Sequence, residues 1–206
     1  MNARRIWILV AAAGLVAATA PAGEKVVFED RFDGKLGEGW TWLRENPQAW
    51  KIADNALEIK VEPGTAGDVK NALCRAAPDR TKGKVAIEVT VTFKNDPTNQ
   101  FEQAGITWYR DGKPAFKLVH ELIDKKLYII PGKKPAEAKT VQLRLVLAGE
   151  QYTAQFRLDA KGDFQTVASG KLPLAKNEQV SIQCYNGPKD EEHWARFDDF
   201  RIVAME

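Results

Sequence analysis

The sequence contains little of the chemistry that builds metal, redox or phosphate sites. Its 206 residues include only two cysteines and two histidines, and the cysteine spacing matches no zinc or redox motif. The glycine-containing stretch EPGTAGD at 62–68 lacks the Lys-Ser/Thr pair and the following helix of a phosphate-binding loop. We therefore expect a protein without an organic cofactor.

Long apolar runs are equally scarce, and the one that exists lies at the N-terminus. Residues 1–22 combine a basic start at Arg4 and Arg5, an apolar run beginning at Ile6, and small residues up to Ala22. This is the plan of a secretory signal peptide cleaved after Ala22. The alternative is an uncleaved anchor, for which the run is short. No later segment is apolar enough to span a membrane, so we expect a soluble domain over 24–206, in the periplasm or outside the cell.

A surplus of charge of one sign is also missing. The 30 Lys and Arg residues oppose 28 Asp and Glu residues, and two of the arginines belong to the signal peptide. A neutral chain without a basic stripe gives no reason to expect nucleic-acid binding. The remaining length suits one domain with a proper core, which we expect to be a monomer.

Helical periodicity is absent after residue 22, and short alternating strands take its place. KVAIEVTVTF at 84–93 puts its valines, Ile87 and Phe93 on one face and its polar residues on the other. The same alternation recurs at 141–147, 152–158 and 180–185, with turn signals between the runs. About eleven such strands predict an all-β jelly-roll sandwich of two antiparallel sheets. VVFEDRF and ARFDDFRIV are expected to pair as terminal strands.

The hairpin at 103–121 is the most informative segment for function. Asp111-Gly112 signals a tight turn that pairs Arg110 with Lys113. Regular alternation from this pair predicts a core face made of Ala104, Ile106, Trp108, Lys117, Val119 and Glu121. The opposite face would carry Gln103, Gly105, Thr107, Tyr109, Phe116, Leu118 and His120. That second face mixes hydrogen-bonding groups with apolar area, which is typical of a ligand-binding face.

The two cysteines, Cys74 and Cys184, allow two interpretations. In an exported protein they can form a disulfide that closes a long loop. The alternative is a pair of small buried thiols, because free cysteine is among the most buried residue types. The sequence does not choose between them.

Three segments in order resemble the concanavalin A-like β-sandwich domains: FEDRFDG…W.W.RENP.AW, QAGITWYRDGKPAFKLVHEL and FDDFRI. Within this group the chain is most similar, over Val26 to Val203, to bacterial domains of unknown function related to the C-terminal sandwich of family 43 glycoside hydrolases. The resemblance implies a jelly-roll associated with glycans and frequently without catalytic activity. A more distant similarity is to exported 3-keto-glycoside hydrolases, from whose strand pattern Gln103-Ala104-Gly105 departs.

Glycoside hydrolysis usually needs two facing carboxylates, and no strand supplies such a pair. Glu88 stands alone, and the spacing of Glu121 and Asp124 puts them on opposite faces of a strand. No Ser-His-Asp or Cys-His set is present. We therefore expect carbohydrate binding without cleavage. The alternatives are a glycoside hydrolase using Glu121 or Glu88 with His120, and an interaction module of the cell envelope without a small ligand.

Ligand binding is expected on the strand faces opposite the core, where rings and hydrogen-bonding groups suit a glycan groove. The predicted ligand-binding residues are Glu88, Gln103, Tyr109, His120, Arg144, Gln183, Tyr185 and Trp194. The alternative is a plain solvent-facing sheet. In WTWLRENPQAW, at least two of Trp40, Trp42 and Trp50 are expected to fill the core.

One metal is worth considering, a structural calcium ion that joins the first and last strands. Calcium needs several oxygen ligands, and Asp30 and Asp198 would contribute them. The alternative is that these are edge carboxylates, one paired with Arg196 or Arg201. A bulge at Asp198-Asp199 is expected, because Phe197 and Phe200 cannot share one face in regular alternation.

Overall fold

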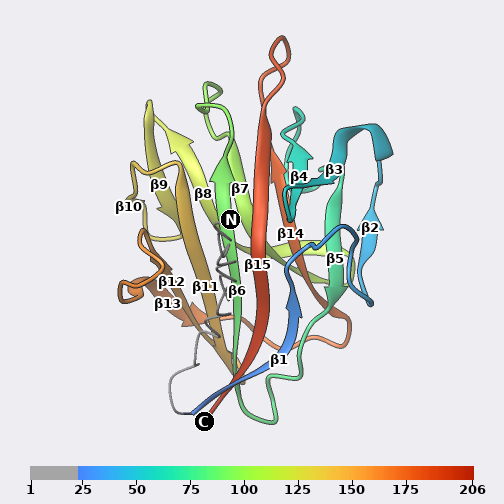
Figure 1. Ribbon diagram of the computed structural model, residues 1–206. Helices are drawn as coiled ribbons and strands as arrows, with labels where there is room; N and C mark the ends of the chain where they lie inside the picture. The colour runs from blue at the N-terminus through green and yellow to red at the C-terminus, as the bar shows by residue number, and fades with distance from the viewer. Residues whose placement is uncertain (1–22) are drawn as a thin grey trace, which may run out of the picture.

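The computed structural model describes residues 23–206, which form two antiparallel sheets packed face to face (Figure 1). The predicted signal peptide, 1–22, lies outside the described residues. Within 23–206 the helical content is one short 3-10 turn, Pro47–Ala49, and no helix in this range is long and apolar enough to cross a membrane. The predicted all-β sandwich is confirmed, and the arrangement is consistent with a jelly roll.

The first sheet, sheet A, has the strand order β13-β12-β11-β6-β15-β4-β3, and β1 also pairs with β15. Its strands are β1 (Glu24–Asp30), β3 (Trp50–Ala53), β4 (Ala56–Lys60), β6 (Lys84–Phe93), β11 (Thr140–Ala148), β12 (Gln151–Arg157), β13 (Gln165–Lys171) and β15 (Trp194–Met205). The pairing of β1 with β15 confirms the predicted terminal strand pair.

The second sheet, sheet B, has the strand order β10-β9-β8-β7-β14-β5-β2. Its strands are β2 (Thr41–Leu43), β5 (Ala72–Ala76), β7 (Gln103–Arg110), β8 (Lys113–Ile123), β9 (Lys126–Ile130), β10 (Lys134–Pro135) and β14 (Glu178–Tyr185). In Figure 1 this sheet lies behind sheet A.

The core lies between the two sheets and follows the period-2 pattern of the strands. On β6, Val85, Ile87, Val89, Val91 and Phe93 are all buried in it. The long strand β15 keeps both Phe197 and Phe200 in the core through a register shift after Asp198, where Asp199 has φ 48°. The predicted bulge is therefore present.

The tryptophans of 40–50 pack against this core from its edge. The Trp40 ring meets Phe200 with a centroid separation of 4.8 Å, and Trp42 meets Trp50 at 4.8 Å. All three are half-buried and pack against the core cluster without being part of its buried set. They therefore line the edge of the core, where the sequence predicted that at least two would fill it.

The 103–121 hairpin differs from its prediction by one residue of register. Arg110 does pair with Lys113, but the register shifts between Trp108 and Tyr109, so that Ala104 lies opposite His120. A bulge adds one unpaired residue and exchanges the faces of every residue beyond it. His120 therefore faces the core, with its ring 5.1 Å from that of Phe93. Lys117 and Glu121, predicted for the core face, lie on the outer face with Gln103.

The two cysteines are free, and both are buried. Cys184 belongs to the core between the sheets, whereas Cys74 packs with Val69 and Tyr185 on the outer face of sheet B. Because the sheet separates the two thiols, the disulfide is not formed, and the interpretation as buried thiols is correct. Burial raises the pKa of both thiols.

Candidate functional site

The eight predicted ligand-binding residues do not form one site. Four lie on the outer face of sheet B: Gln103, Tyr109, Gln183 and Tyr185. Two lie on the outer face of sheet A, Glu88 and Arg144. His120 is in the core, and Trp194 stands at the start of β15, outside the hollow formed near Glu88 and Arg144.

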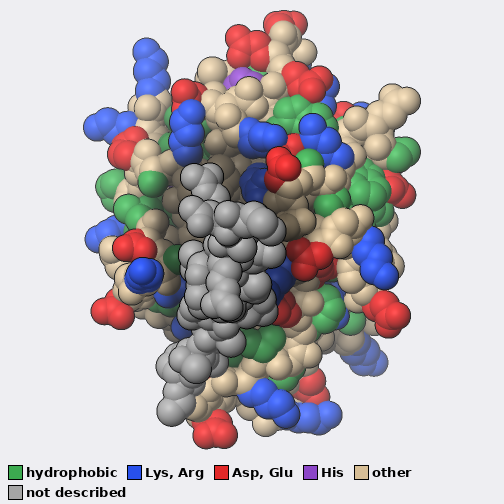
Figure 2. Space-filling view, viewed as in Figure 1, with side chains coloured by type: hydrophobic (Ala, Val, Ile, Leu, Met, Phe, Trp, Pro, Cys, Tyr) green, Lys and Arg blue, Asp and Glu red, His purple; other side chains and the backbone are tan. Residues whose placement is uncertain are grey.

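The outer face of sheet A is hollowed. A cavity of about 830 Å³ extends over β1, β15, β6, β11 and β12. Figure 2 views the molecule from the side of sheet A and shows acidic and basic side chains mixed over its visible surface. The charged residues that line the hollow are Glu24, Glu29, Arg31, Lys84, Glu88, Arg144, Arg157, Asp163 and Arg201.

Most charges of the hollow are already paired. The Nε of Arg144 lies 3.1 Å from Glu88, and its other end contacts Glu24. Across the hollow, Arg201 Nε lies 2.9 Å from Glu29. Burial raises the pKa of Glu88, and the charge of Arg144 opposes that shift. These ion pairs fix the positions of the side chains that form them, and they leave little net charge around Arg144 and Arg201.

Arg157 is the arginine of the hollow that has no carboxylate partner within residues 23–206. Its Nε donates to Gln142 Oε1 at 2.5 Å, and its terminal nitrogen donates to the Gly162 carbonyl at 3.1 Å. Its guanidinium lies 4.4 Å from the Phe164 ring centroid, where Arg144 also approaches at 4.9 Å. Arg157 is thus held in place by neutral groups, with its charge available to a ligand. Sequence reasoning missed both Arg157 and Phe164.

Residues 61–71, which we call the covering loop, lie over part of the outer face of sheet B. Val69 and Ala66 of the loop pack with Cys74 and Tyr185 of the sheet. The Tyr109 hydroxyl reaches the Ala66 carbonyl at 3.5 Å. Consequently the predicted residues on this face are buried, at 0–5 % exposure.

Beneath the covering loop the polar side chains bond to one another. Gln183 Oε1 accepts from the Tyr109 hydroxyl at 2.9 Å and from Ser181 at 3.0 Å. Burial raises the pKa of Tyr109 to about 12, and it raises that of Tyr185 as well. Both phenols therefore stay protonated and serve as neutral hydrogen-bonding groups.

Beside these groups, two charged side chains and one amide form a triad on β7 and β8. Lys117 Nζ lies 2.7 Å from Gln103 Oε1 and 2.9 Å from Glu121 Oε2. Gln103 Nε2 completes the triangle to Glu121 at 3.4 Å. From the sequence, Gln103 was predicted to lie on the opposite face from Lys117 and Glu121. The bulge that brings the three together could not be read from the alternation of side chains.

The residues named for the alternative hydrolase do not meet. Glu88 and Glu121 project from the outer faces of opposite sheets. His120 is fully buried, with Nε2 at 2.9 Å from the Ala136 carbonyl, and burial lowers its pKa to about 4. These three side chains therefore do not make a common acid-base site.

The two carboxylates considered for calcium have protein partners. Asp30 accepts from the amides of Phe32 and Gly37 and from Trp40 Nε1, each at 2.8 Å. Asp198 lies 3.3 Å from Arg196. Among residues 23–206 no group of three or more His, Cys, Asp or Glu is arranged to hold a metal ion. Calcium binding stays a prediction, and it would require these carboxylates to exchange partners.

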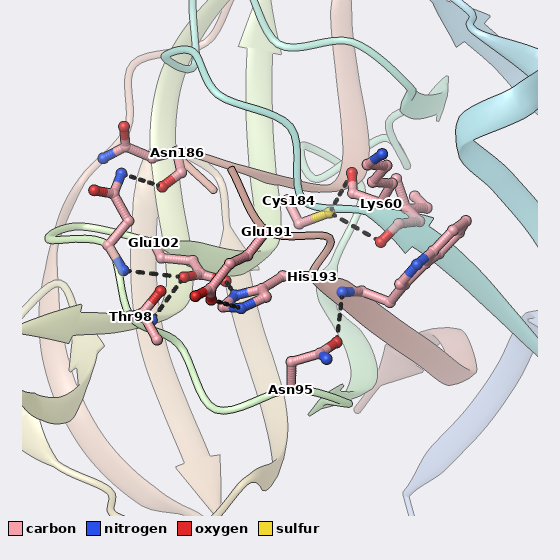
Figure 3. Close-up of polar contacts among 11 residues, drawn as sticks. Lys60, Asn95, Thr98, Glu102, Cys184, Asn186, Glu191 and His193 are labelled. Carbon is pink, nitrogen blue, oxygen red and sulfur yellow. Dashed lines mark hydrogen bonds and ion pairs between the residues drawn. The ribbon is translucent and has the colours of Figure 1, made fainter. Parts of the chain in front are cut away.

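One buried polar cluster at an end of the sandwich was not anticipated (Figure 3). Glu102 is fully buried and accepts from the amides of Thr98 and Asn99, at 3.0 and 3.3 Å. Its other oxygen lies 2.8 Å from His193 Nδ1, while His193 Nε2 lies 3.2 Å from Glu191. Both ring nitrogens of His193 therefore lie against carboxylate oxygens. The cluster ties the loop before β7 to the loop before β15.

Comparison with solved structures identifies this fold in several carbohydrate-active proteins. The GH43 BlXynB protein from Bacillus licheniformis superposes with a TM-score of 0.74 at 22% identity, covering 85% of this chain and 39% of that one. The Bacteroides ovatus protein described as "Xyloglucan PUL GH43B" gives 0.68 at 18% identity, covering 86% of this chain and 39% of that one.

A functionally unknown protein from Saccharomyces cerevisiae gives a TM-score of 0.58 at 13% identity, covering 82% of this chain and 97% of that one. The chain thus spans 39% of the length of the two GH43 structures, and at these identities the likeness shows the fold. The sandwich implied by the resemblance to family 43 glycoside hydrolases is confirmed. No protein-family model matches the sequence, and no curated protein matches it.

Proposed function

We propose that this chain is an exported domain that binds carbohydrate in the hollow of sheet A without cleaving it. The observation that carries the proposal is the hollow itself, about 830 Å³ of open space whose lining mixes apolar area with charged groups. Ligand sites are typically concave, of this size, and furnished with a few polar groups that orient the ligand. The predicted residues Glu88 and Arg144 both belong to it.

Binding is favoured over cleavage because of how the carboxylates are used. Glu88 and Glu24 both contact Arg144, and Glu29 contacts Arg201. The charge of Arg144 opposes the rise in the pKa of Glu88 and so disfavours the protonated form that a general acid needs. The same groups are well placed to accept hydrogen bonds from sugar hydroxyls at the edge of each ion pair.

The nature of the ligand follows from the fold's relatives as a proposal. The names of the similar structures include a xylan β-1,4-xylosidase and "Xyloglucan PUL GH43B". Xylo-oligosaccharides and xyloglucan oligosaccharides are therefore the first ligands to test. Export is tested separately, since the intact mass of the secreted protein should correspond to a chain beginning at Gly23.

Calorimetric titration of residues 23–206 with these oligosaccharides tests the binding proposal. We expect saturable binding that weakens by about tenfold or more in Arg157→Ala, because a hydrogen bond to a charged group contributes about 1.5–3 kcal/mol. The matched control is Arg110→Ala, in the β7–β8 hairpin away from the hollow, which should bind like the unmodified protein.

Three results would count against the proposal. Absence of binding to any glycan on an array would favour the interaction-module alternative. Equal affinity of Arg157→Ala and the unmodified protein would remove the hollow as the site. Release of reducing sugar from a bound oligosaccharide would show that the domain is catalytic.

A further inference from the structure

The hollow of sheet A contains one positive charge that its own side chains do not balance. Five basic and four acidic side chains line it. One group joins Arg144 to two glutamates, and a second group joins Glu29 to two arginines, so the two groups together are neutral. Lys84 and Asp163 also line the hollow, and their opposite charges offset each other. The charge of Arg157 is the one that remains.

The register of the strands explains why Arg157 stands apart. Directly opposite residues on β1, β15, β6 and β11 form a row of alternating charge across the sheet: Glu29, Arg201, Glu88 and Arg144. On the next strand, β12, the neutral Gln155 lies opposite Arg144. Arg157 lies two residues further along β12, opposite Gln142. Same-face neighbours along a strand are about 7 Å apart, so Arg157 lies outside the row in which the other charges neutralise one another.

The guanidinium of Arg157 is held in place and still has donors to offer. A guanidinium has five N–H donors, and two of those of Arg157 bond to Gln142 and to the Gly162 carbonyl. The Phe164 ring lies against it, at 4.4 Å from centroid to guanidinium carbon. The other N–H groups belong to a side chain that lines the hollow. A planar guanidinium held in this way matches a carboxylate, which can accept two parallel hydrogen bonds.

An apolar strip runs beside the row of charges, on the side away from Arg157. Val203, Ala86 and Val146 lie opposite one another on β15, β6 and β11, and they form a small buried cluster with Met205 packed against it. Apolar surface beside polar groups is typical of ligand sites. Along the strand direction the strip is about 14 Å from the position of Arg157, since four residues separate them. A ligand that contacts both is longer than one sugar ring, which indicates an oligosaccharide.

We infer that the hollow selects an oligosaccharide that bears one carboxylate, and that Arg157 receives this carboxylate. The inference rests on the proposed function of the hollow and adds the charge of its ligand. One carboxylate neutralises the excess charge of Arg157, whereas a neutral glycan leaves it unbalanced. A phosphate monoester carries close to two negative charges at neutral pH, so it would leave the hollow negative.

Calorimetric titration of residues 23–206 tests the inference with two ligands that differ only in charge. The acid is a xylo-oligosaccharide that carries one glucuronic acid residue, and the methyl ester of the same molecule is its neutral counterpart. We expect the acid to bind about tenfold more tightly or better, because hydrogen bonds to an ionised group are about twice as strong as neutral ones. Added salt should reduce this preference, since it screens the charges.

Variants of Arg157 show whether this side chain provides the preference. Arg157→Gln keeps a hydrogen-bonding group and removes the charge, so the ratio of the two affinities should fall to about one. Binding of the ester by this variant shows that its hollow is folded. Arg157→Lys keeps the charge without the planar fork and should retain part of the preference. The matched control is Arg110→Gln, in the β7–β8 hairpin away from the hollow, which should keep the full ratio.

The outcomes separate this inference from the proposed function. Equal binding of the acid and the ester by the unmodified protein would overturn the inference and leave the proposed function standing. Binding of neither would overturn the inference together with xylo-oligosaccharide binding in the hollow. A preference that persists in Arg157→Gln and is lost in Lys84→Gln would place the carboxylate elsewhere.

Two further results complete the test. If Arg157→Gln binds neither ligand, Arg157→Lys decides the matter, because a retained preference for the acid supports the inference and a lost one contradicts it. Acetate should not displace the acid, since it makes none of the sugar contacts. Displacement by acetate at equal concentration would mean that any carboxylate suffices, and the inference of an oligosaccharide would be wrong.

Discussion

The outer face of sheet A carries its charges around a hollow, whereas the outer face of sheet B carries its polar groups beneath residues 61–71. In the hollow, Arg144 pairs with the buried Glu88, and Arg201 pairs with Glu29 nearer the surface. Beneath the loop, Tyr109, Ser181 and Gln183 form neutral hydrogen bonds. The outer face of sheet A therefore presents ion pairs around an open hollow, whereas neutral hydrogen bonds lie beneath a loop on sheet B.

The two faces differ in how much free energy an unpaired polar group costs. At the surface, water satisfies any polar atom, and an ion pair contributes about 0–1 kcal/mol. Under the covering loop no such substitute exists, so every donor and acceptor must find a protein partner or a ligand. Arg157 therefore indicates a site only together with the hollow that it lines.

The largest effect that would sharpen this contrast is expected for Gly105→Ala. A Cβ at this position would clash with the Leu118 carbonyl oxygen and lie 2.8 Å from Cα of Val119. Since the clash is with backbone, we expect a loss of about 3 kcal/mol in the free energy of unfolding, measured by urea denaturation.

Gly83→Ala, just before β6 of sheet A, is the control for this change. A Cβ there meets nothing within 4 Å, and the free energy of unfolding should change by less than about 0.5 kcal/mol. Equal behaviour of the two variants would contradict the close approach of β7 and β8 at Gly105.

The next largest effect is a pH dependence of the folding stability, which arises from His120 on the core side of β8. His120 faces the core with a pKa lowered to about 4 by burial, below its ordinary value near 6.5. The unfolded chain therefore binds more protons between these values. The contribution of the uncharged His120 to the free energy of unfolding is fully present above pH 6.5. It is lost as the pH falls toward 4, by about 3 kcal/mol at most.

Chemical denaturation of the unmodified protein and of His120→Gln over this range measures the contribution. We expect His120→Gln to flatten the slope of stability against pH, even where it lowers stability overall. His193→Gln, at the end of the sandwich, should keep the part of the slope that belongs to His120. An unchanged slope in His120→Gln would mean that the ring does not face the core.

The smallest effect concerns the covering loop. Val69 is 2 % exposed beneath it, whereas Val26 of β1, at the hollow, is 42 % exposed. Val69→Ala should cost about 1–2 kcal/mol, because two buried methyl groups are lost. It should also speed amide exchange at Tyr109 and Gln183.

Val26→Ala makes the same chemical change on the open face. It should change stability by less than about 0.5 kcal/mol and leave amide exchange in sheet B unaltered. If Val69→Ala proved as mild as Val26→Ala, the covering loop would not seal the face of sheet B.

Much of the fold was predictable because alternation is a local property of the chain. The strand at 84–93, the terminal pair of β1 and β15 and the turn at Asp111-Gly112 all follow from neighbouring residues. The bulge at Asp198-Asp199 was also predictable, since Phe197 and Phe200 otherwise conflict. The bulge in β8 had no such conflict, because either register leaves an acceptable mixture of side chains on each face.

The candidate sites were only partly predictable for the same reason. Glu88, Arg144, Gln103 and Gln183 were singled out by residue type and outer-face parity. Their division between two sheets depends on strand order, which the sequence does not state. Arg157 was missed, since an arginine on a strand is ordinarily a solvated surface residue. Lys117 was assigned to the core face, because the register shift in the hairpin was not predicted.

The sequence by itself determined the all-β architecture, the strands and their apolar faces, because each depends on the period-2 alternation of adjacent side chains. Only the tertiary structure decided which face is open and which is covered, where the β8 register slips, and that Cys74 and Cys184 stay apart. Those features arise from contacts between residues far apart in the chain, such as Ala66 with Tyr109 and Glu24 with Arg144. Local pattern cannot encode them, because the energy of such a contact depends on where the rest of the fold places its partner.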